Sequence, residues 1–327
     1  MTDQTRHSPP PAQGVRLRWE DIPLQVREVI EQKLGSPVIS VASQPKGFSP
    51  GLAARLTTAE GQRVFVKAAG PEPSPDTASF HRREAKIAAL LPPTAPAPRL
   101  LWSYDDPASG WIVLAFQDVD GRHPAQPWRL DELTRVLDAL IVLSESLTPS
   151  PLPPGSVPTA GDVFSTSIFG WRELQQADSD ILDRLDPWSA RHLADLAAIE
   201  ATAREAVAGD TLLHADIRED NLLLTPDAVW VVDWPHACVG AAWVDVVAFA
   251  PSVAMQGGPP PEDTLNYHPA ARQADPDAIT AAIVSLAGFF THRALLPPPP
   301  GLPTLREFQR AQGEVARAWI ADRLGWK

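Results

Sequence analysis

Cysteine is almost absent from this chain of 327 residues, which carries only Cys238. A single thiol can form no internal disulfide and no thiolate zinc site. The 8 histidines are scattered, without the short spacings that metal ligands favour. No apolar run is long enough to cross a bilayer, and the N-terminal stretch MTDQTRHSPPPAQG lacks the apolar core of a secretory signal. These absences predict a cytoplasmic protein with no membrane partner.

Positive charge is also scarce, since 28 Lys and Arg residues face 40 Asp and Glu residues, for a net charge of -12. This balance argues against binding to nucleic acid or anionic lipid, because both require clustered basic residues. A cationic substrate would suit the sign of the charge, although an acidic surface more often serves solubility. The hydrophobic content of 44% is ordinary for a globular protein with a substantial core.

The first part of the chain predicts a small antiparallel sheet with one helix packed on it. Residues 1–14 are rich in proline and polar residues, which is typical of a disordered tail. Apolar residues at helical spacing predict a helix over 21–34 that ends at Gly35. Alternating and β-branched patterns predict the remaining elements: strands at 37–43, 52–58 and 62–69, a helix at 75–91, and strands near 99–104 and 110–116.

After Gly121 the pattern becomes mainly helical. Pro-rich connections separate the segments, and the last helix starts with Thr304 and Glu307 at capping-box spacing. The predicted helices cover 129–147, 162–175, 188–207, 240–254, 275–296 and 304–325. The sequence therefore predicts an α+β protein with a small sheet-containing part followed by a larger helical part.

Two opposite charges fall where apolar residues are expected. Lys67 lies in the strand RVFVKAA, where an unpaired ammonium would cost several kcal/mol of desolvation. In the following helix, Glu84 shares one face with Phe80, Ile87 and Leu91. A buried cation and a buried anion on neighbouring elements are best explained as partners, so we expect an ion pair between Lys67 and Glu84.

The segment QPKGFSPGLAARL (44–56) joins the first two strands. Gly47 and Gly51 permit close backbone approach, and Ser49 offers a hydroxyl and an N–H group. Such a loop could cradle a phosphate group, and it could equally be an ordinary hairpin connection.

The stretch LLHADIREDNLLL (212–224) places charged and amide side chains between apolar runs. The strands 222–224 and 229–232 are joined by a turn sequence and should form a hairpin. Closing that hairpin brings Asn221 and Asp233 to within about 5–6 Å, with Asp216 one short loop away. Oxygen ligands of this kind suit Mg²⁺ better than zinc.

The order of these features resembles the protein-kinase-like arrangement. The sequences HADIREDN (214–221) and VVDWPHACVG (231–240) resemble those of the aminoglycoside phosphotransferase and choline kinase family, which phosphorylates small molecules. The resemblance implies a two-lobed α+β fold and a small hydroxylated substrate. It implies a nucleotide-binding lobe over 15–116, a linker between the lobes over 117–121, and a helical catalytic and substrate-binding lobe over 122–327.

The resemblance also implies roles for the matching residues. Asp216 corresponds to the catalytic base that orients and deprotonates the acceptor hydroxyl. Asn221 and Asp233 correspond to the two positions that bind Mg²⁺ against the nucleotide phosphates. Lys67 corresponds to the lysine that contacts the α- and β-phosphates of ATP, with GTP as the alternative nucleotide, and Glu84 corresponds to its partner.

Further matches lie outside this set. Gly47 and Ser49 fall where the family has its phosphate-covering loop. The backbones of Gln117 and Val119 would receive the edge of the adenine ring. Asp245 resembles a buried aspartate that braces the catalytic loop.

Arg218 has two interpretations of equal weight. Its cation could neutralise charge that develops on the γ-phosphate, which would make it catalytic together with Asp216. It could instead pair with Glu219 or Asp220. His214 is expected to be a packed, hydrogen-bonded core histidine.

The complete set of Lys, Glu, Asp, Asn and Asp favours an active kinase that uses ATP and Mg²⁺ to phosphorylate a small hydroxylated molecule. The alternative is a catalytically silent pseudo-kinase that binds nucleotide as a binding module. A protein kinase is disfavoured, because few residues separate Asp233 from the helix predicted at 240–254. Acidic residues in 173–186 and at 262–263 could receive an aminoglycoside, or they could be solvated helix faces. Choline, amino-alcohol, sugar and macrolide acceptors remain alternatives.

Overall fold

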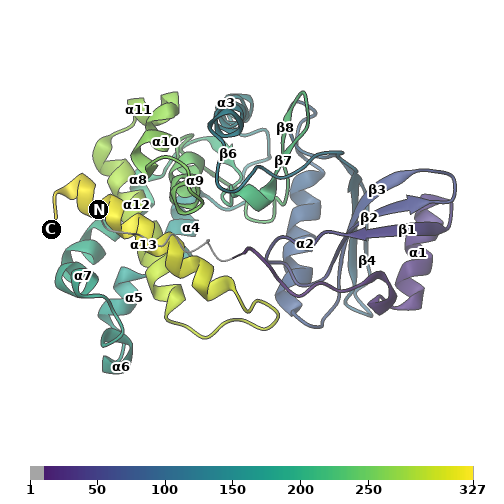
Figure 1. The fold of residues 1–327 in the computed structure, drawn as a ribbon, viewed down its shortest axis with the longest axis horizontal. Helices are drawn as coiled ribbons and strands as arrows, with labels where there is room; N and C mark the ends of the chain where they lie inside the picture. Colours follow the sequence, from purple (N-terminus) through teal and green to yellow (C-terminus); the bar gives the residue numbers. More distant parts are fainter. Residues whose placement is uncertain (1–10, 327) are drawn as a thin grey trace.

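The N-terminal part is built on a five-stranded antiparallel sheet with strand order β1-β2-β3-β5-β4 (Figure 1). The computed structural model describes residues 11–326. The strands are β1 (Val38–Ser43), β2 (Leu52–Thr58), β3 (Arg63–Ala69), β4 (Leu100–Asp105) and β5 (Ile112–Gln117). The sheet and its strand boundaries agree closely with the sequence prediction.

The two faces of this sheet are covered by different helices. A short 3-10 helix, η1 (Trp19–Asp21), leads into α1 (Leu24–Leu34), which packs Val26 and Ile30 against one face. Gly35 ends α1 in the left-handed conformation, with φ of 71°. On the opposite face, α2 (Pro75–Ala88) packs against β3 and β5, and it lies between the sheet and the helical part (Figure 1). Because side chains alternate along β3, Lys67 points toward α2.

The C-terminal part is largely helical and contains the larger apolar core. The core includes the helix pair α12 and α13, which lie side by side (Figure 1). The helices of the C-terminal part are α3 (Leu130–Ser146), α4 (Ala160–Thr166), α5 (Trp171–Gln175), α6 (Ser179–Leu182), α7 (Pro187–Glu200), α8 (Ala203–Ala206), α9 (Val244–Met255), α10 (Pro261–Tyr267), α11 (Pro269–Gln273), α12 (Pro276–Ala294) and α13 (Leu305–Leu324). Within residues 11–326, no helix combines the length and apolar character that a membrane span requires.

Two small sheets position the polar stretch that the sequence analysis singled out. β6 (Thr211–Leu213) pairs with β9 (Cys238–Gly240), and β7 (Leu222–Leu224) pairs with β8 (Val229–Val231). Between β6 and β7, residues 219–221 form a 3-10 turn, η2 (Glu219–Asn221). The hairpin of β7 and β8 is therefore present as predicted.

Some helices predicted as continuous are divided. The segment 162–175 forms α4 and α5, and 188–207 forms α7 and α8. Residues 167–170 separate α4 from α5, and at Gly170 a Cβ atom would stand 1.9 Å from the carbonyl oxygen of Gly288 on α12. This close approach of two backbones requires glycine at position 170, and apolar periodicity carries no signal of it. The predicted helix at 240–254 starts later, at Val244, because residues 238–240 belong to β9.

The N-terminal segment takes a defined path. Residues 1–10 of the predicted disordered tail lie outside the described residues. Residues 11–17, here called the N-terminal strap, run beside the loop between β1 and β2. Gly14 donates a backbone hydrogen bond to Gly47 (2.8 Å), and Leu17 donates one to Gly51 (3.0 Å). The strap also contacts the segment before α13, because Val15 donates to Gly301 (2.9 Å).

Candidate active site

Lys67 lies at the centre of a buried charge cluster. Its Nζ atom donates hydrogen bonds to both carboxylate oxygens of Glu84 (2.8 and 2.9 Å) and to Oδ1 of Asp233 (2.7 Å). The side chains of Lys67 and Glu84 are 12% and 2% exposed. The predicted ion pair between Lys67 and Glu84 is confirmed. The third partner, Asp233, joins β3 and α2 of the N-terminal part to the end of the C-terminal hairpin.

The three charges shift one another's pKa values. Burial disfavours the charge of Lys67, but Asp233 and Glu84 together raise its pKa. Burial likewise opposes ionisation of Asp233, yet the adjacent ammonium of Lys67 holds the pKa of Asp233 below its usual range. Burial raises the pKa of Glu84, against the attraction of Lys67. The cluster thus keeps a charged lysine and a charged Asp233 in a mostly dry environment.

The loop after β6 is held by a buried carboxylate from α9. Asp245 accepts hydrogen bonds from the backbone N–H groups of His214 (2.9 Å) and Ala215 (2.8 Å). Ala215 adopts a left-handed conformation, with φ of 61°, which is costly for a residue with a side chain. These two bonds compensate that cost and fix the direction in which the chain enters Asp216. His214 is fully buried, and its Nε2 atom lies 3.0 Å from the Val232 carbonyl oxygen, as expected for a core histidine.

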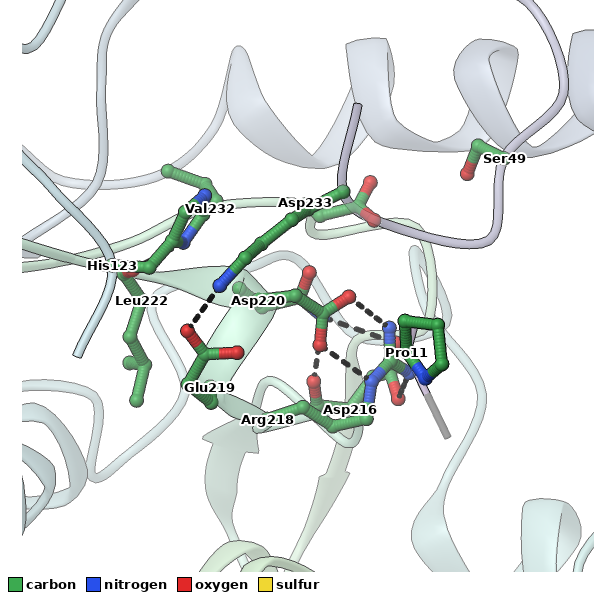
Figure 2. A network of polar contacts seen from close by, with 12 residues as sticks. Pro11, Ser49, His123, Asp216, Arg218, Glu219, Asp220, Leu222, Val232 and Asp233 are labelled. Carbon is green, nitrogen blue, oxygen red and sulfur yellow. Dashed lines mark hydrogen bonds and ion pairs between the residues drawn. The ribbon is translucent and has the colours of Figure 1, made fainter. Parts of the chain in front are cut away.

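Asp216 is held from two sides. The Nδ2 group of Asn221 donates to the backbone oxygen of Asp216 (2.8 Å) and to its Oδ2 atom (3.2 Å). Arg218 donates to Oδ1 of Asp216 and forms a two-pronged ion pair with Asp220 (both 2.9 Å), as Figure 2 shows. Of the two carboxylates considered as partners for Arg218, Asp220 forms an ion pair with it and Glu219 does not. Glu219 instead accepts from Lys46 (2.6 Å).

The hairpin register refines the expected position of Asp233. Leu222 pairs with Val231, and Val232 donates to the carbonyl oxygen of Asn221 (3.0 Å). The residue opposite Asn221 is therefore Val232, and Asp233 follows it. Asp233 itself has φ of 71°, and its carboxylate accepts from Lys67.

The loop between β1 and β2 closes over these groups, and Figure 2 shows Ser49 on it. Gly47 adopts φ of 97°, and a Cβ atom there would stand 2.9 Å from the guanidinium of Arg16. Arg16, from the N-terminal strap, donates to the carbonyl oxygens of Lys46 and Ser49. The charges of Asp233 and Asp220 oppose the lowering of the Arg16 pKa by burial. Arg16 therefore anchors the loop beside the carboxylates of the site.

One cavity of about 250 Å³ lies between the sheet and the hairpin. Lys67, Glu84 and Asp233 line one end, together with Gly47, Ser49 and Asn221. Apolar side chains such as Leu52, Phe116 and Leu223 line other parts, and residues 117–119 form one edge.

The backbones of Gln117 and Val119, both expected to bind the nucleotide at this edge, have different hydrogen-bond partners. The N–H group of Gln117 donates to the carbonyl oxygen of Arg99 (2.9 Å). The carbonyl oxygen of Val119 accepts from Arg55 (2.7 Å) and from the N–H of Gly121 (2.9 Å). Within the described part of the chain, the N–H group of Val119 has no acceptor, so it is free to meet a ligand.

The oxygen donors of the site fit Mg²⁺ shared with a phosphate ligand. In residues 11–326, no three His, Cys, Asp or Glu side chains form a cage that could hold a metal ion alone. Asn221 uses its Nδ2 group on Asp216, which leaves its amide oxygen for a cation. Lys67 binds Oδ1 of Asp233 and leaves Oδ2. Two hard oxygens, with the remaining positions filled by water and phosphate, are the usual protein contribution to an Mg²⁺ site.

His81, on α2, is 3% exposed and lies beside the charge cluster. Burial and the charge of Lys67 lower its pKa to about 3. Above about pH 6.5 the histidine is neutral in both the folded and the unfolded protein, so burying His81 carries no penalty from protonation. As the pH drops toward 3, the unfolded histidine takes up a proton and the free energy of unfolding falls. Between pH 6.5 and 4, the free energy of unfolding should fall more steeply for the native protein than for His81→Gln, by up to about 1.4 kcal/mol per pH unit. Urea unfolding at a series of pH values measures both slopes, and equal slopes would contradict the prediction.

The structure places Ser49, Lys67, Glu84, Asn221 and Asp233 around one cavity, with Asp216 and Arg218 beside them, and it adds further residues. Arg16 and Lys46 are the additions, and Asp220, considered above as a partner of Arg218, joins them. Lys46 adjoins Gly47 in the sequence, which could have indicated it. Arg16 lies in a segment without apolar periodicity, and no sequence signal marks it.

Known proteins share this architecture. The profile of the family described as the phosphotransferase enzyme family matches residues 45–318. No curated protein matches the chain in sequence. A thermostable mutant of aminoglycoside phosphotransferase APH(4)-Ia, solved with AMP-PNP and hygromycin B, superposes with a TM-score of 0.62 at 16% identity, over 93% of this chain and 100% of that one. Choline kinase LicA from Streptococcus pneumoniae superposes with a TM-score of 0.56 at 12% identity, over 90% of this chain and 99% of that one. At such identities the likeness establishes the fold.

Proposed function

The chain belongs to the phosphotransferase enzyme family, and from this premise we propose that it transfers the γ-phosphoryl group of ATP to a hydroxyl group of a small molecule. The observation that carries the proposal is a pair of adjoining cavities, with Asp216 in the lining of the larger one. The cavity of about 250 Å³ and a second cavity of about 1070 Å³ share Ser49 and Asp233 in their linings. Asp216 lines only the second cavity, at the side where an acceptor would enter.

We assign the smaller cavity to the nucleotide. Its apolar middle suits an adenine ring, and the free N–H group of Val119 offers a hydrogen bond to the ring edge. Lys67 would contact the α- and β-phosphates, while Gly47 and Ser49 would cover them. Bound Mg²⁺, held by Asn221 and Asp233, would supply charge neutralisation for the phosphates. AMP-PNP in the APH(4)-Ia complex supports an adenine nucleotide.

Asp216 acts on the acceptor in this proposal. Its carboxylate accepts the proton of the acceptor hydroxyl, and the hydroxyl oxygen attacks the γ-phosphorus in line with the leaving ADP. Asn221 and Arg218 hold the carboxylate in position through the hydrogen bonds described above. Arg218, which lies 5.4 Å from the ring centre of Phe48 on the loop, also offers positive charge near the transferring group.

The chain between Asp233 and α9 is short, which leaves the acceptor side open. Only residues 234–243 separate the two, and 238–240 of these are fixed in β9. A small molecule can reach Asp216 through the second cavity, so small acceptors suit the site better than a protein substrate.

The proposal is tested by following ADP release from ATP and Mg²⁺ across a panel of hydroxylated metabolites and antibiotics, with mass spectrometry to detect the phosphorylated product. Transfer to at least one acceptor, abolished by EDTA and restored by Mg²⁺, is the expected result. Calorimetric titration with ATP and Mg²⁺ serves as the parallel measurement. Tight nucleotide binding without transfer to any member of the panel would favour the silent binding module instead.

Arg16 gives a separate prediction about the nucleotide. Arg16→Gln removes the charged donor that holds the carbonyl oxygens of Lys46 and Ser49, so the loop over the phosphates loses its anchor. We expect the KM for ATP to rise about tenfold, in line with about 1.5 kcal/mol for a hydrogen bond to a charged group. The kcat should change by less than about threefold. Arg18→Gln, an exposed arginine two residues away, is the matched control; a variant at Arg16 with the KM of that control would refute the prediction.

A further inference from the structure

The acceptor side of the site is a large cavity with an aromatic wall. Its volume of about 1070 Å³ is enough for a drug-sized molecule. The cavity lies between α2, α4, α12 and α13, with Asp216 and Arg218 at the end that meets the nucleotide cavity. Its aromatic lining consists of Phe48, Phe80, Phe164, Phe289, Phe290 and Phe308. Phe48 and Phe308 contact each other edge to face at 5.2 Å. This wall suits an acceptor with an apolar or aromatic body.

Three arginines line the same cavity without a carboxylate partner. Arg83 on α2, Arg293 near the end of α12 and Arg306 at the start of α13 form no ion pair with any residue in 11–326. Neutral groups hold them instead. Arg83 lies over the ring of Phe80 (5.9 Å) and Arg293 over that of Phe289 (5.7 Å). Arg306 donates to the carbonyl oxygen of Pro297 (3.0 Å) and to the side-chain oxygen of Gln309 (2.8 Å).

All but one of the carboxylates that line the cavity already form an ion pair. Asp162 pairs with Arg204 (2.9 Å). Asp216 pairs with Arg218, and Asp233 with Lys67. Asp76 is the remaining carboxylate of the lining that has no cation within the described chain. The cavity wall therefore presents three unpaired cations against one unpaired anion.

Arg293 is close enough to Arg306 to disfavour the charge of Arg306. Burial and the positive charge of Arg293 lower the pKa of Arg306. The same two guanidinium groups contribute to lowering the pKa of His292, after the larger effect of burial. Two partly buried cations facing one cavity repel each other, and an anion bound between them would relieve that repulsion.

We propose that the acceptor is an anionic hydroxy compound with an apolar or aromatic body, whose carboxylate or phosphate group binds Arg293 and Arg306 and whose hydroxyl group reaches Asp216. The inference rests on the proposed function, because it names the substrate class of that site. It weighs against polycationic acceptors. The acidic residues considered for an aminoglycoside in 173–186 and at 262–263 do not line the cavity. Asp186 pairs with Arg317 and Glu262 with Arg323.

The test compares three probes that share a benzyl group and a secondary hydroxyl and differ in charge. They are 3-phenyllactate, the neutral 3-phenylpropane-1,2-diol and the cationic 1-amino-3-phenylpropan-2-ol. Their dissociation constants are measured by ligand-observed NMR on the full chain, with ATP-independent binding as the readout. We expect 3-phenyllactate to bind at least about tenfold more tightly than the diol, with the amine weakest, and this preference to shrink at high salt. Equal or weaker binding of 3-phenyllactate would overturn the inference.

Variants connect the preference to the two arginines. Arg293→Gln together with Arg306→Gln should reduce the preference to less than about twofold, whereas Arg306→Lys should retain most of it because the charge remains. Arg310→Gln, an exposed site on α13 outside the cavity lining, is the matched control. Thermal unfolding and ATP affinity verify that the double variant is folded. A folded double variant that keeps the full preference would also overturn the inference.

The outcomes separate this inference from the proposed function. Phosphoryl transfer to cationic or neutral acceptors, with no preference for anions, supports the kinase and rejects the anionic acceptor. A clear preference for 3-phenyllactate without any ATP turnover leaves the charge selectivity of the cavity standing and rejects the kinase.

Discussion

Replacing Asp216 by asparagine is expected to lower kcat by about 10²–10⁴-fold, the usual contribution of a general base. The amide has nearly the same shape as the carboxylate and can keep a hydrogen bond with Arg218 or Asn221, but it cannot accept the proton of the acceptor hydroxyl. Because Asp216 lies outside the lining of the nucleotide cavity, ATP affinity should change by less than about threefold. Steady-state kinetics with the best acceptor of the panel, and calorimetric titration with ATP, measure the two quantities.

Asp227→Asn is the matched control for this substitution. Asp227 is an exposed carboxylate in the turn between β7 and β8, so its replacement makes the same chemical change away from the cavities. The control should retain the native kcat. An Asp216→Asn protein with more than about a tenth of the native kcat would show that Asp216 is not the base.

Lys67→Met is expected to abolish nucleotide binding and to destabilise the protein. The lysine is the shared partner of Glu84 and Asp233, and its loss leaves a carboxylate that is 2% exposed without a counterion. Breaking a buried ion pair in this way costs about 3–5 kcal/mol. The double variant Lys67→Met with Glu84→Gln removes the uncompensated charge, so it should recover much of the stability while remaining unable to bind ATP.

The loss of stability in Lys67→Met should depend on pH, because the uncompensated carboxyl group is Glu84. Burial raises the pKa of Glu84 even with Lys67 present. A carboxyl group whose pKa is raised by folding binds its proton more tightly when folded, so stability falls as the pH rises from about 4.5 through the folded pKa. Without Lys67 the pKa rises further and the loss extends to higher pH. Urea unfolding should therefore show the Lys67→Met defect to be larger at pH 8 than at pH 5, and the difference to be smaller in the double variant. A defect that is the same at both pH values would contradict the explanation.

Features whose signals lie within one or two elements were predictable from the sequence. The Lys67–Glu84 pair was predictable because a charged residue within an apolar helical face needs a partner. The hairpin of β7 and β8 was predictable from its turn, and it brings Asp233 to Asn221, although the register places Val232 directly opposite. The pairing of Arg218 was ambiguous, because Glu219 and Asp220 both follow it. The 3-10 turn at 219–221 separates them, and Asp220 pairs with Arg218 while Glu219 pairs with Lys46.

Other features depend on contacts that sequence patterns do not record. The break at residues 167–170 includes a close approach of two backbones at Gly170. The path of residues 11–17 follows from hydrogen bonds between backbone atoms, which any residue type except proline can donate. The three unpaired arginines of the larger cavity were also not predictable. Arg83, Arg293 and Arg306 come from three different helices, and the net charge of the whole chain has the opposite sign.

The N-terminal strap joins the loop between β1 and β2 to the segment before α13. On one side it is bonded to Gly47 and Gly51 of the loop over the smaller cavity, and on the other to Gly301 and, through Pro11 and Gln13, to the hydroxyl of Thr304. Thr304 directly precedes α13, which carries Arg306 and Phe308 into the larger cavity. Residues 11–17 therefore tie the loop over the smaller cavity to the helix that lines the larger one, so a substitution that displaces the loop is expected to displace that helix as well.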